Sequence, residues 1–135
     1  MTIISRGVIC ELGIAAIILG VSISRAPAQD VAAGEISFGR CLGCHAVGVD
    51  AKNKIGPKLN GIEGRKCGAV DGYIYSAANK DCSFTWSEAV FVEYIRDPKA
   101  KIPGTRKSIS GIRDETEARN LWAYLRQFGP DGRPK

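Results

Sequence analysis

The sequence predicts one small all-α domain, in which a few helices are joined by long loops. A chain of 135 residues with 44% apolar side chains can enclose one core and leaves little for a second. Three segments place apolar residues at helical spacing, and no stretch alternates convincingly over several residues, as a half-buried strand would. The expected architecture is therefore helical, with loops wrapped around the core.

The first 28 residues have the pattern of a secretory signal peptide. The basic Arg6 precedes a mostly apolar stretch, and small residues of the segment RAPAQD surround the expected cleavage point after Ala28. A retained membrane anchor and a core helix are the alternatives, because the apolar stretch is close to the length that spans a bilayer. Glu11 within the stretch weakens the anchor. We expect an exported, periplasmic domain over residues 29–135.

The first and last helices of this domain are expected over residues 34–41 and 115–128. Gly34 is small enough to let another helix approach closely, and Phe38 lies on the expected buried face. The last helix should end before a Gly-Pro pair, and its apolar residues recur at helical spacing: Leu121, Tyr124 and Leu125.

A further helix is expected between these two, over residues 86–96. Ser87 stands near its start, and Asp97-Pro98 should end it, because the residue before a proline disfavours the helical conformation. Its inward-facing side chains are predicted to be Val90, Phe91 and Tyr94.

The segment CLGCH, residues 41–45, carries the strongest chemical signal. Cys-x-x-Cys-His is the attachment motif for a covalent haem. The thiols of Cys41 and Cys44 can each add to one vinyl group of the porphyrin, and His45, the only histidine of the chain, can then bind the iron. The motif predicts one haem c.

Two other sites could use these cysteines. A redox dithiol of the thioredoxin type would follow a strand, whereas the sequence before Cys41 looks helical. A zinc site could take four thiolates, from Cys41, Cys44, Cys67 and Cys82, but it would leave His45 without a role.

With this motif in place, the mature chain resembles the class I cytochromes c, the monohaem electron carriers of the bacterial periplasm and the mitochondrial intermembrane space. The resemblance covers essentially all of it and extends, in the family's order, through GPKLNGIEGRKCG, GYIYSAANKD, FTWSEAVFVEYIRDPKAKIPGT and ARNLWAYLRQF. It implies that the first and last helices cross and that the loops are held by the haem.

The resemblance also implies roles for residues outside the haem motif. The Pro57 carbonyl would accept a hydrogen bond from the second ring nitrogen of His45. The family places donors to the haem propionates at Arg65, Tyr75 and Trp86, with Thr105 and Asn79 as weaker members of the same network. Simple aromatic core packing is the alternative for Tyr75 and Trp86.

The family does not supply Cys67 and Cys82, which flank the loop that carries Tyr75. In an exported protein, two cysteines on either side of a tight loop most simply form a disulfide, although two unpaired buried thiols remain the alternative. A bridge here would remove about 3 kcal/mol of loop entropy from the unfolded chain.

Lys107 stands where the family has the methionine that binds the distal face of the iron. Met1 is the only methionine and is expected to leave with the signal, so a His/Met carrier is ruled out. Three alternatives remain: ligation by Lys107 through its neutral amine, ligation by Lys99 or Lys101, or a site open to water and small ligands. A hard amine would lower the reduction potential relative to a thioether.

These features leave two function classes. The first is a non-enzymatic carrier of single electrons, expected to be a monomer, that docks on acidic redox proteins through surface lysines: Lys58, Lys66, Lys99 and Lys101. The second is a ligand-binding or peroxidase-like haem protein with an open distal face, for which the chain offers no distal histidine.

The charge of the exported domain bears on its partners. Cleavage after Ala28 would remove Arg6, Arg25 and Glu11, so that 19 basic and 14 acidic residues become 17 and 13, a net charge of +4. No basic run interleaved with aromatics points to nucleic acid, and a membrane would be met only through partners or a retained anchor.

Overall fold

The structure is a computed structural model that describes residues 28–135. The signal peptide predicted for residues 1–28 therefore lies, except for Ala28, outside the described residues. Within the described part, five α-helices and one 3-10 turn contain all of the regular structure, and the only β contacts are two isolated bridges. The elements are α1 (Val31–Phe38), η1 (Gly39–Cys41), α2 (Ala77–Lys80), α3 (Glu88–Arg96), α4 (Pro98–Lys101) and α5 (Glu115–Leu125). The predicted all-α fold is confirmed.

Helix α1 begins three residues before the predicted start at Gly34. Asp30 caps the helix, because its side chain accepts a hydrogen bond from the backbone N–H of Ala33 at 3.0 Å. An N-cap can be recognised in a sequence only when the following periodic residues are clear, and VAAG offers no distinct apolar face. The 3-10 turn then carries the chain to Cys41.

Helix α3 begins two residues after the predicted start at Trp86. The N–H of Trp86 donates to the carbonyl of Arg65 at 2.9 Å, so this residue pairs with a distant loop instead of entering the helix. Ser87 is the N-cap, with its hydroxyl 3.4 Å from the N–H of Val90. Val90 itself is only half-buried, which corrects the prediction that it faces the core.

Helix α5 ends at Leu125, three residues before the predicted end at Phe128. The N–H of Gly61 donates to the carbonyl of Phe128 at 3.0 Å, and Phe128 also forms an isolated bridge with Pro134. These contacts with other segments replace the last helical turn. The prediction also missed two single-turn helices, α2 and α4, because four residues are too few to show a period.

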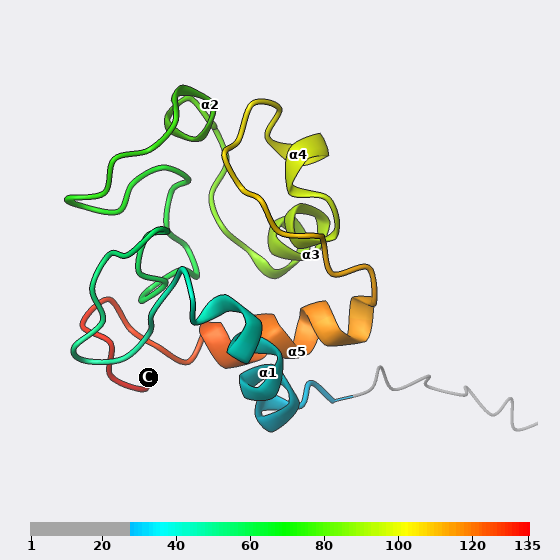
Figure 1. Ribbon diagram of the computed structural model, residues 1–135. Coiled ribbons are helices and arrows are strands. Elements are labelled where there is room, and N and C mark those ends of the chain that lie inside the picture. Colours follow the sequence, from blue (N-terminus) through cyan, green and yellow to red (C-terminus); the bar gives the residue numbers. More distant parts are fainter. Residues whose placement is uncertain (1–27) are drawn as a thin grey trace, which may run out of the picture.

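The core forms where α1 crosses α5, with α3 packed on the same helix (Figure 1). A side-chain β-carbon on Gly34 would lie 2.0 Å from the carbonyl oxygen of Asn120, so only glycine permits this crossing. The largest fully buried side chains are Trp122, Phe38, Leu121 and Leu125. Trp122 escaped the sequence prediction, although it faces the core next to Leu121. Among residues 28–135, no helix is both long enough and apolar enough for a membrane span.

Candidate haem site

A cavity of about 390 Å³ opens between the helical core and the loops, within the range of about 300–1,000 Å³ that is usual for cofactor sites. Its floor is apolar and includes buried side chains from α3 and α5. The residues that matter for its chemistry come from four separate segments: Cys41, Cys44 and His45; Pro57 and Arg65; Tyr75 and Asn79; Thr105 and Lys107. Trp86 also lines it. The structure therefore brings all of the predicted site residues to one cavity.

The CLGCH segment follows α1 as a tight turn. The N–H groups of Cys44 and His45 both donate to the carbonyl of Cys41, at 3.0 and 2.8 Å. Cys41 and Cys44 are half-buried free thiols on the cavity wall. A helix and a 3-10 turn, not a strand, precede them, which argues against a thioredoxin-like dithiol.

His45 is oriented by a backbone carbonyl. Its Nδ1 lies 2.7 Å from the carbonyl oxygen of Pro57, which fixes the hydrogen on Nδ1 and leaves the Nε2 lone pair free for a metal. Burial, together with the nearby positive charge of Lys107, lowers the pKa of His45 to about 4. The imidazole is therefore neutral at physiological pH, as a ligand must be.

Gly56 makes room for this imidazole, and sequence reasoning gave it no role. A β-carbon at Gly56 would lie 2.3 Å from the His45 ring, and the N–H of Gly56 donates to the carbonyl of Cys44 at 2.8 Å. The signal available in the sequence was the Gly-Pro pair, which predicts a constrained turn but not the ring that packs against it.

Arg65 is a partly buried cation at the cavity wall. Its guanidinium donates to the carbonyl oxygens of Asn60 at 2.7 Å and Lys58 at 3.4 Å. Its Nε is buried and has no hydrogen-bond partner among the described residues. An unsatisfied buried donor on a cation is costly, and an anionic group in the cavity would satisfy it.

The other predicted polar residues form a hydrogen-bonded wall. The Tyr75 hydroxyl accepts from the N–H of Val70 at 3.1 Å and keeps its own hydrogen free to donate. The Thr105 hydroxyl donates to Asn79 Oδ1 at 2.8 Å. The Trp86 ring contacts Phe84 and other aromatic rings in edge-on geometry, so it serves core packing as well as the cavity.

Lys107 is the only lysine on the cavity wall among residues 28–135. Burial lowers the pKa of its amine, whereas the Cys41 and Cys44 thiols act in the opposite sense. The ammonium nitrogen lies 5.5 Å from the ring centre of Tyr94, a buried phenol whose pKa is raised by burial. Tyr94 was expected to face inward, but its position beside the lysine was not foreseen.

The two alternative lysines do not line the cavity. Lys101 pairs with Glu93 at 2.6 Å and lies over the Phe84 ring, 5.6 Å from its centre. Lys99 is exposed on α4.

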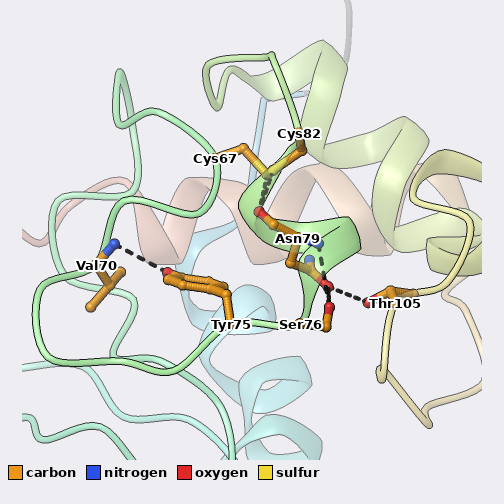
Figure 2. The surroundings of a disulfide bond; sticks show 7 residues. All are labelled: Cys67, Val70, Tyr75, Ser76, Asn79, Cys82 and Thr105. Carbon is orange, nitrogen blue, oxygen red and sulfur yellow. Dashed lines mark hydrogen bonds between the residues drawn. A yellow bond between two sulfur atoms is a disulfide. The ribbon is translucent and has the colours of Figure 1, made fainter.

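Cys67 and Cys82 form a disulfide with a Cα–Cα distance of 5.8 Å (Figure 2). The predicted bridge is confirmed. Because these two sulfurs are bonded to each other, the alternative zinc site with four thiolates is excluded. No group of three or more His, Cys, Asp or Glu side chains within residues 28–135 is arranged to hold a metal ion.

The cavity fits a haem. Its floor is apolar, two free thiols and a neutral, oriented imidazole share one turn of its wall, and a buried guanidinium lacks one partner there. An apolar ring with carboxylate substituents is the kind of group that satisfies both the floor and Arg65.

Several known proteins are similar to the chain. Cytochrome c-550 of Bradyrhizobium diazoefficiens is 58% identical over 77% of this chain and 76% of its own. Cytochrome c2 of Blastochloris viridis is 52% identical over 87% of this chain and 93% of its own. The solved structure of cytochrome c2 from Rhodospirillum centenum matches with a TM-score of 0.68 at 35% identity, over 75% of this chain and 99% of that one. No protein-family model matches the sequence.

Identities above one half over most of both chains, together with a matching fold and a cavity of the required chemistry, leave one conclusion. The chain belongs to the class I cytochromes c of the c2 and c-550 type, a family of electron carriers that hold one covalently attached haem c.

Proposed function

We propose that this cytochrome carries single electrons between periplasmic or membrane redox proteins, and that His45 and Lys107 would hold the iron of its haem. The observation that carries the proposal is that Lys107 is the only lysine on the cavity wall in the described part of the chain, while Lys99 and Lys101 lie elsewhere. The haem supplies the one-electron chemistry. The protein supplies the ligands, the hydrogen bonds and the access of partners.

Attachment and proximal ligation are assigned to the CLGCH turn. The thiols of Cys41 and Cys44 would form the two thioethers, and His45 would bind through Nε2. The Pro57 carbonyl, 2.7 Å from Nδ1, supports this assignment because it fixes the tautomer and increases the basicity of the ligand.

The carboxylate groups are assigned to the polar wall. Arg65 would pair with a propionate through its unsatisfied Nε. Tyr75 would donate its free hydroxyl hydrogen, and Trp86 its indole N–H. The Thr105 hydroxyl already donates its hydrogen to Asn79, so it would not donate to a propionate. Its role would be to accept a hydrogen bond or to hold Asn79 in place.

Lys107 would bind as the neutral amine. Burial favours that form by lowering the pKa, and the opposing effect of the Cys41 and Cys44 thiols would disappear once both became thioethers. A hard nitrogen donor stabilises ferric iron relative to a thioether. The reduction potential should therefore lie below that of a His/Met carrier. Its electron donors and acceptors should then have correspondingly low reduction potentials.

Docking on acidic redox proteins is assigned to the lysines Lys58, Lys66, Lys99 and Lys101. Lys66 and Lys99 are exposed, whereas Lys58 and Lys101 are partly buried. Lys101 is already paired with Glu93, which reduces its contribution. The net charge of +4 expected for the exported chain favours association with an acidic surface. We propose that the exported form is a monomer, without residues 1–28.

The electron paramagnetic resonance spectrum of the ferric protein at several pH values tests the proposal, together with the rate of imidazole binding. Nitrogen ligation by Lys107 predicts a low-spin spectrum at neutral pH and slow entry of imidazole. A high-spin spectrum with fast imidazole binding would instead support the open-site alternative, a ligand-binding or peroxidase-like haem protein.

A further inference from the structure

The proposed function assigns no role to the Cys67–Cys82 disulfide, which lies next to the site. It closes a loop of sequence separation 15 that contains α2 and Tyr75. Cys67 is 3% exposed and belongs to a small apolar cluster with Tyr94 and Ile102. The disulfide therefore sits beside the chain segment that leads to Lys107.

Asn79 lies between the disulfide and that segment (Figure 2). Its carbonyl oxygen is 2.7 Å from Cys82 Sγ and 3.9 Å from Cys67 Sγ. Its side-chain oxygen Oδ1 accepts hydrogen bonds from two hydroxyl groups, that of Ser76 at 2.9 Å and that of Thr105 at 2.8 Å. One residue thus contacts the disulfide with its backbone and the distant Thr105 with its side chain.

Helix α2 cannot hold Asn79 in place by itself. It has four residues, and a single helical turn costs more conformational entropy than its hydrogen bonds return. Two tertiary contacts hold it instead. The disulfide joins Cys67 to Cys82, which lies two residues after the end of α2. Gly68 lies directly against the Asn79 carbonyl, because a β-carbon on Gly68 would come within 2.4 Å of it.

The segment 103–109, which we call the distal segment, is in turn held by Thr105. The N–H of Thr105 donates to the Ile102 carbonyl at 3.0 Å, and its hydroxyl oxygen accepts from the N–H of Lys107 at 3.3 Å. Gly104 also lies close to α2, because a β-carbon added to it would come within 3.3 Å of the Ala78 side chain. The rest of the distal segment has no regular structure.

We infer that the Cys67–Cys82 disulfide and Asn79 position the distal segment: the disulfide fixes α2, Asn79 fixes Thr105, and Thr105 fixes the backbone of Lys107. Asn79 and Thr105 are positioning residues in this chain of contacts. The order of the segment does not require Lys107 to bind iron. Only the spectroscopic consequence, a sixth ligand held more firmly, rests on the proposed function.

The test measures amide hydrogen exchange in the distal segment of the haem-loaded protein. Removal of the disulfide in C67A/C82A should speed exchange at the hydrogen-bonded amides of Thr105 and Lys107 by about tenfold, which is the effect of losing one hydrogen bond's net contribution. Because the bridge constrains the unfolded chain by about 3 kcal/mol, amides of Leu121–Leu125 that exchange through global unfolding should also speed in this variant. Exchange at Thr105 and Lys107 that speeds without depending on denaturant marks local loosening instead. The matched control is Asn53→Ala, which removes a bond to the Asp71 carbonyl on the far part of the same loop.

Two Thr105 variants keep the test decisive if the disulfide variant does not fold. Thr105→Val preserves shape and removes the hydroxyl, so it should speed exchange as C67A/C82A does, whereas Thr105→Ser should stay within about twofold of the parent. If the disulfide acts through this contact, the combined variant C67A/C82A/T105V should exchange no faster than the more affected of the two. Imidazole should also enter the ferric protein faster in the disulfide-free form.

Unchanged exchange at the amides of Thr105 and Lys107 in C67A/C82A, or full additivity with Thr105→Val, would overturn the inference. Repeating the exchange measurement in Lys107→Ala tests the positioning inference separately from the proposed iron ligation. If Lys107 is not a ligand, its removal leaves the ferric spectrum unchanged, and the disulfide should still govern the exchange of the distal segment.

Discussion

Among single residues, Lys107 has the largest expected consequence, because as the proposed iron ligand it would set both the reduction potential and the accessibility of the iron. Lys107→Ala should open the sixth position, shift the ferric spectrum toward high-spin or water-bound iron, and let cyanide or imidazole enter faster. Lys99→Ala is the matched control, since it removes an exposed lysine outside the cavity. A ferric spectrum that Lys107→Ala leaves unchanged would rule this residue out as the ligand.

Acid should release the same ligand. The amine must lose its proton to bind, and burial lowers its pKa from the ordinary value of 10.5. The unfolded chain takes up this proton at a higher pH than the folded chain, so folding stability should fall as pH drops from 10.5 to the lowered pKa of the folded state. The iron ligand should be released only when pH falls below that lowered pKa. A titration of the ferric spectrum should show a low-spin to high-spin change on acidification. Lys107→Ala should lack this transition; if the variant retains it, another group titrates.

Lys107→Met should have an effect different from that of the alanine variant. The substitution returns a soft sulfur donor to a position from which the side chain already reaches the cavity. The reduction potential should rise, and a weak near-infrared sulfur-to-iron band should appear, because thioether sulfur favours ferrous iron. Redox titration and near-infrared absorption measure the two effects. Absence of the band together with an unchanged potential would mean that residue 107 does not reach the iron.

Among the contacts between helices, the crossing of α1 and α5 leaves no room for even one added methyl group. Gly34→Ala would place a methyl group 2.0 Å from the Asn120 carbonyl, which is backbone and cannot turn away. We expect it to lower the free energy of unfolding by about 2 kcal/mol or more. Denaturant unfolding followed by circular dichroism measures the change.

Gly39→Ala is the control for this prediction. It adds the same methyl group at the end of α1, where nothing lies within 4 Å, and the backbone angle there suits any residue. Its effect should stay within about 1 kcal/mol. Equal losses in the two variants would show that the helix crossing is not as tight as the distance implies.

For the whole molecule, the cavity sets the condition under which the fold is stable. Without a group to fill this cavity of about 390 Å³, its apolar lining would face water and lose the packing contacts of a closed core. The net stability of a domain is only about 5–15 kcal/mol, so such a loss strongly disfavours the folded state. Chain produced without haem should therefore lack the cooperative thermal transition of the loaded protein, as followed by circular dichroism. Similar melting curves for the two forms would contradict this.

The covalent attachment expected at Cys41 and Cys44 is tested by extraction with acidified acetone. The colour should remain with the protein, because thioether bonds survive conditions that break axial ligation. A C41A/C44A variant that still takes up haem should lose its colour to the solvent. Haem extracted from the unaltered protein would contradict thioether attachment.

The sequence by itself determined the chemistry that depends on neighbours along the chain. CLGCH predicted the haem, Asp97-Pro98 ended α3 where expected, and Phe38 and Leu121 were correctly placed in the core. These features follow from spacings of three or four residues, which a helix or a turn converts directly into proximity. Helix boundaries were less accurate, because Trp86 and Phe128 bond to segments far away in sequence.

Only the tertiary structure decided the features that depend on which distant segments meet. It decided between the predicted Cys67–Cys82 bridge and its alternatives, unpaired thiols or a zinc site, and of the three candidate lysines it brought only Lys107 to the cavity wall. It also gave Asn79 its position between the disulfide and Thr105, and Gly56 its contact with His45. The physical reason is that such contacts are fixed by the packing of the whole core, in which a residue's neighbours are chosen by shape and by chain closure and leave no local pattern in the sequence.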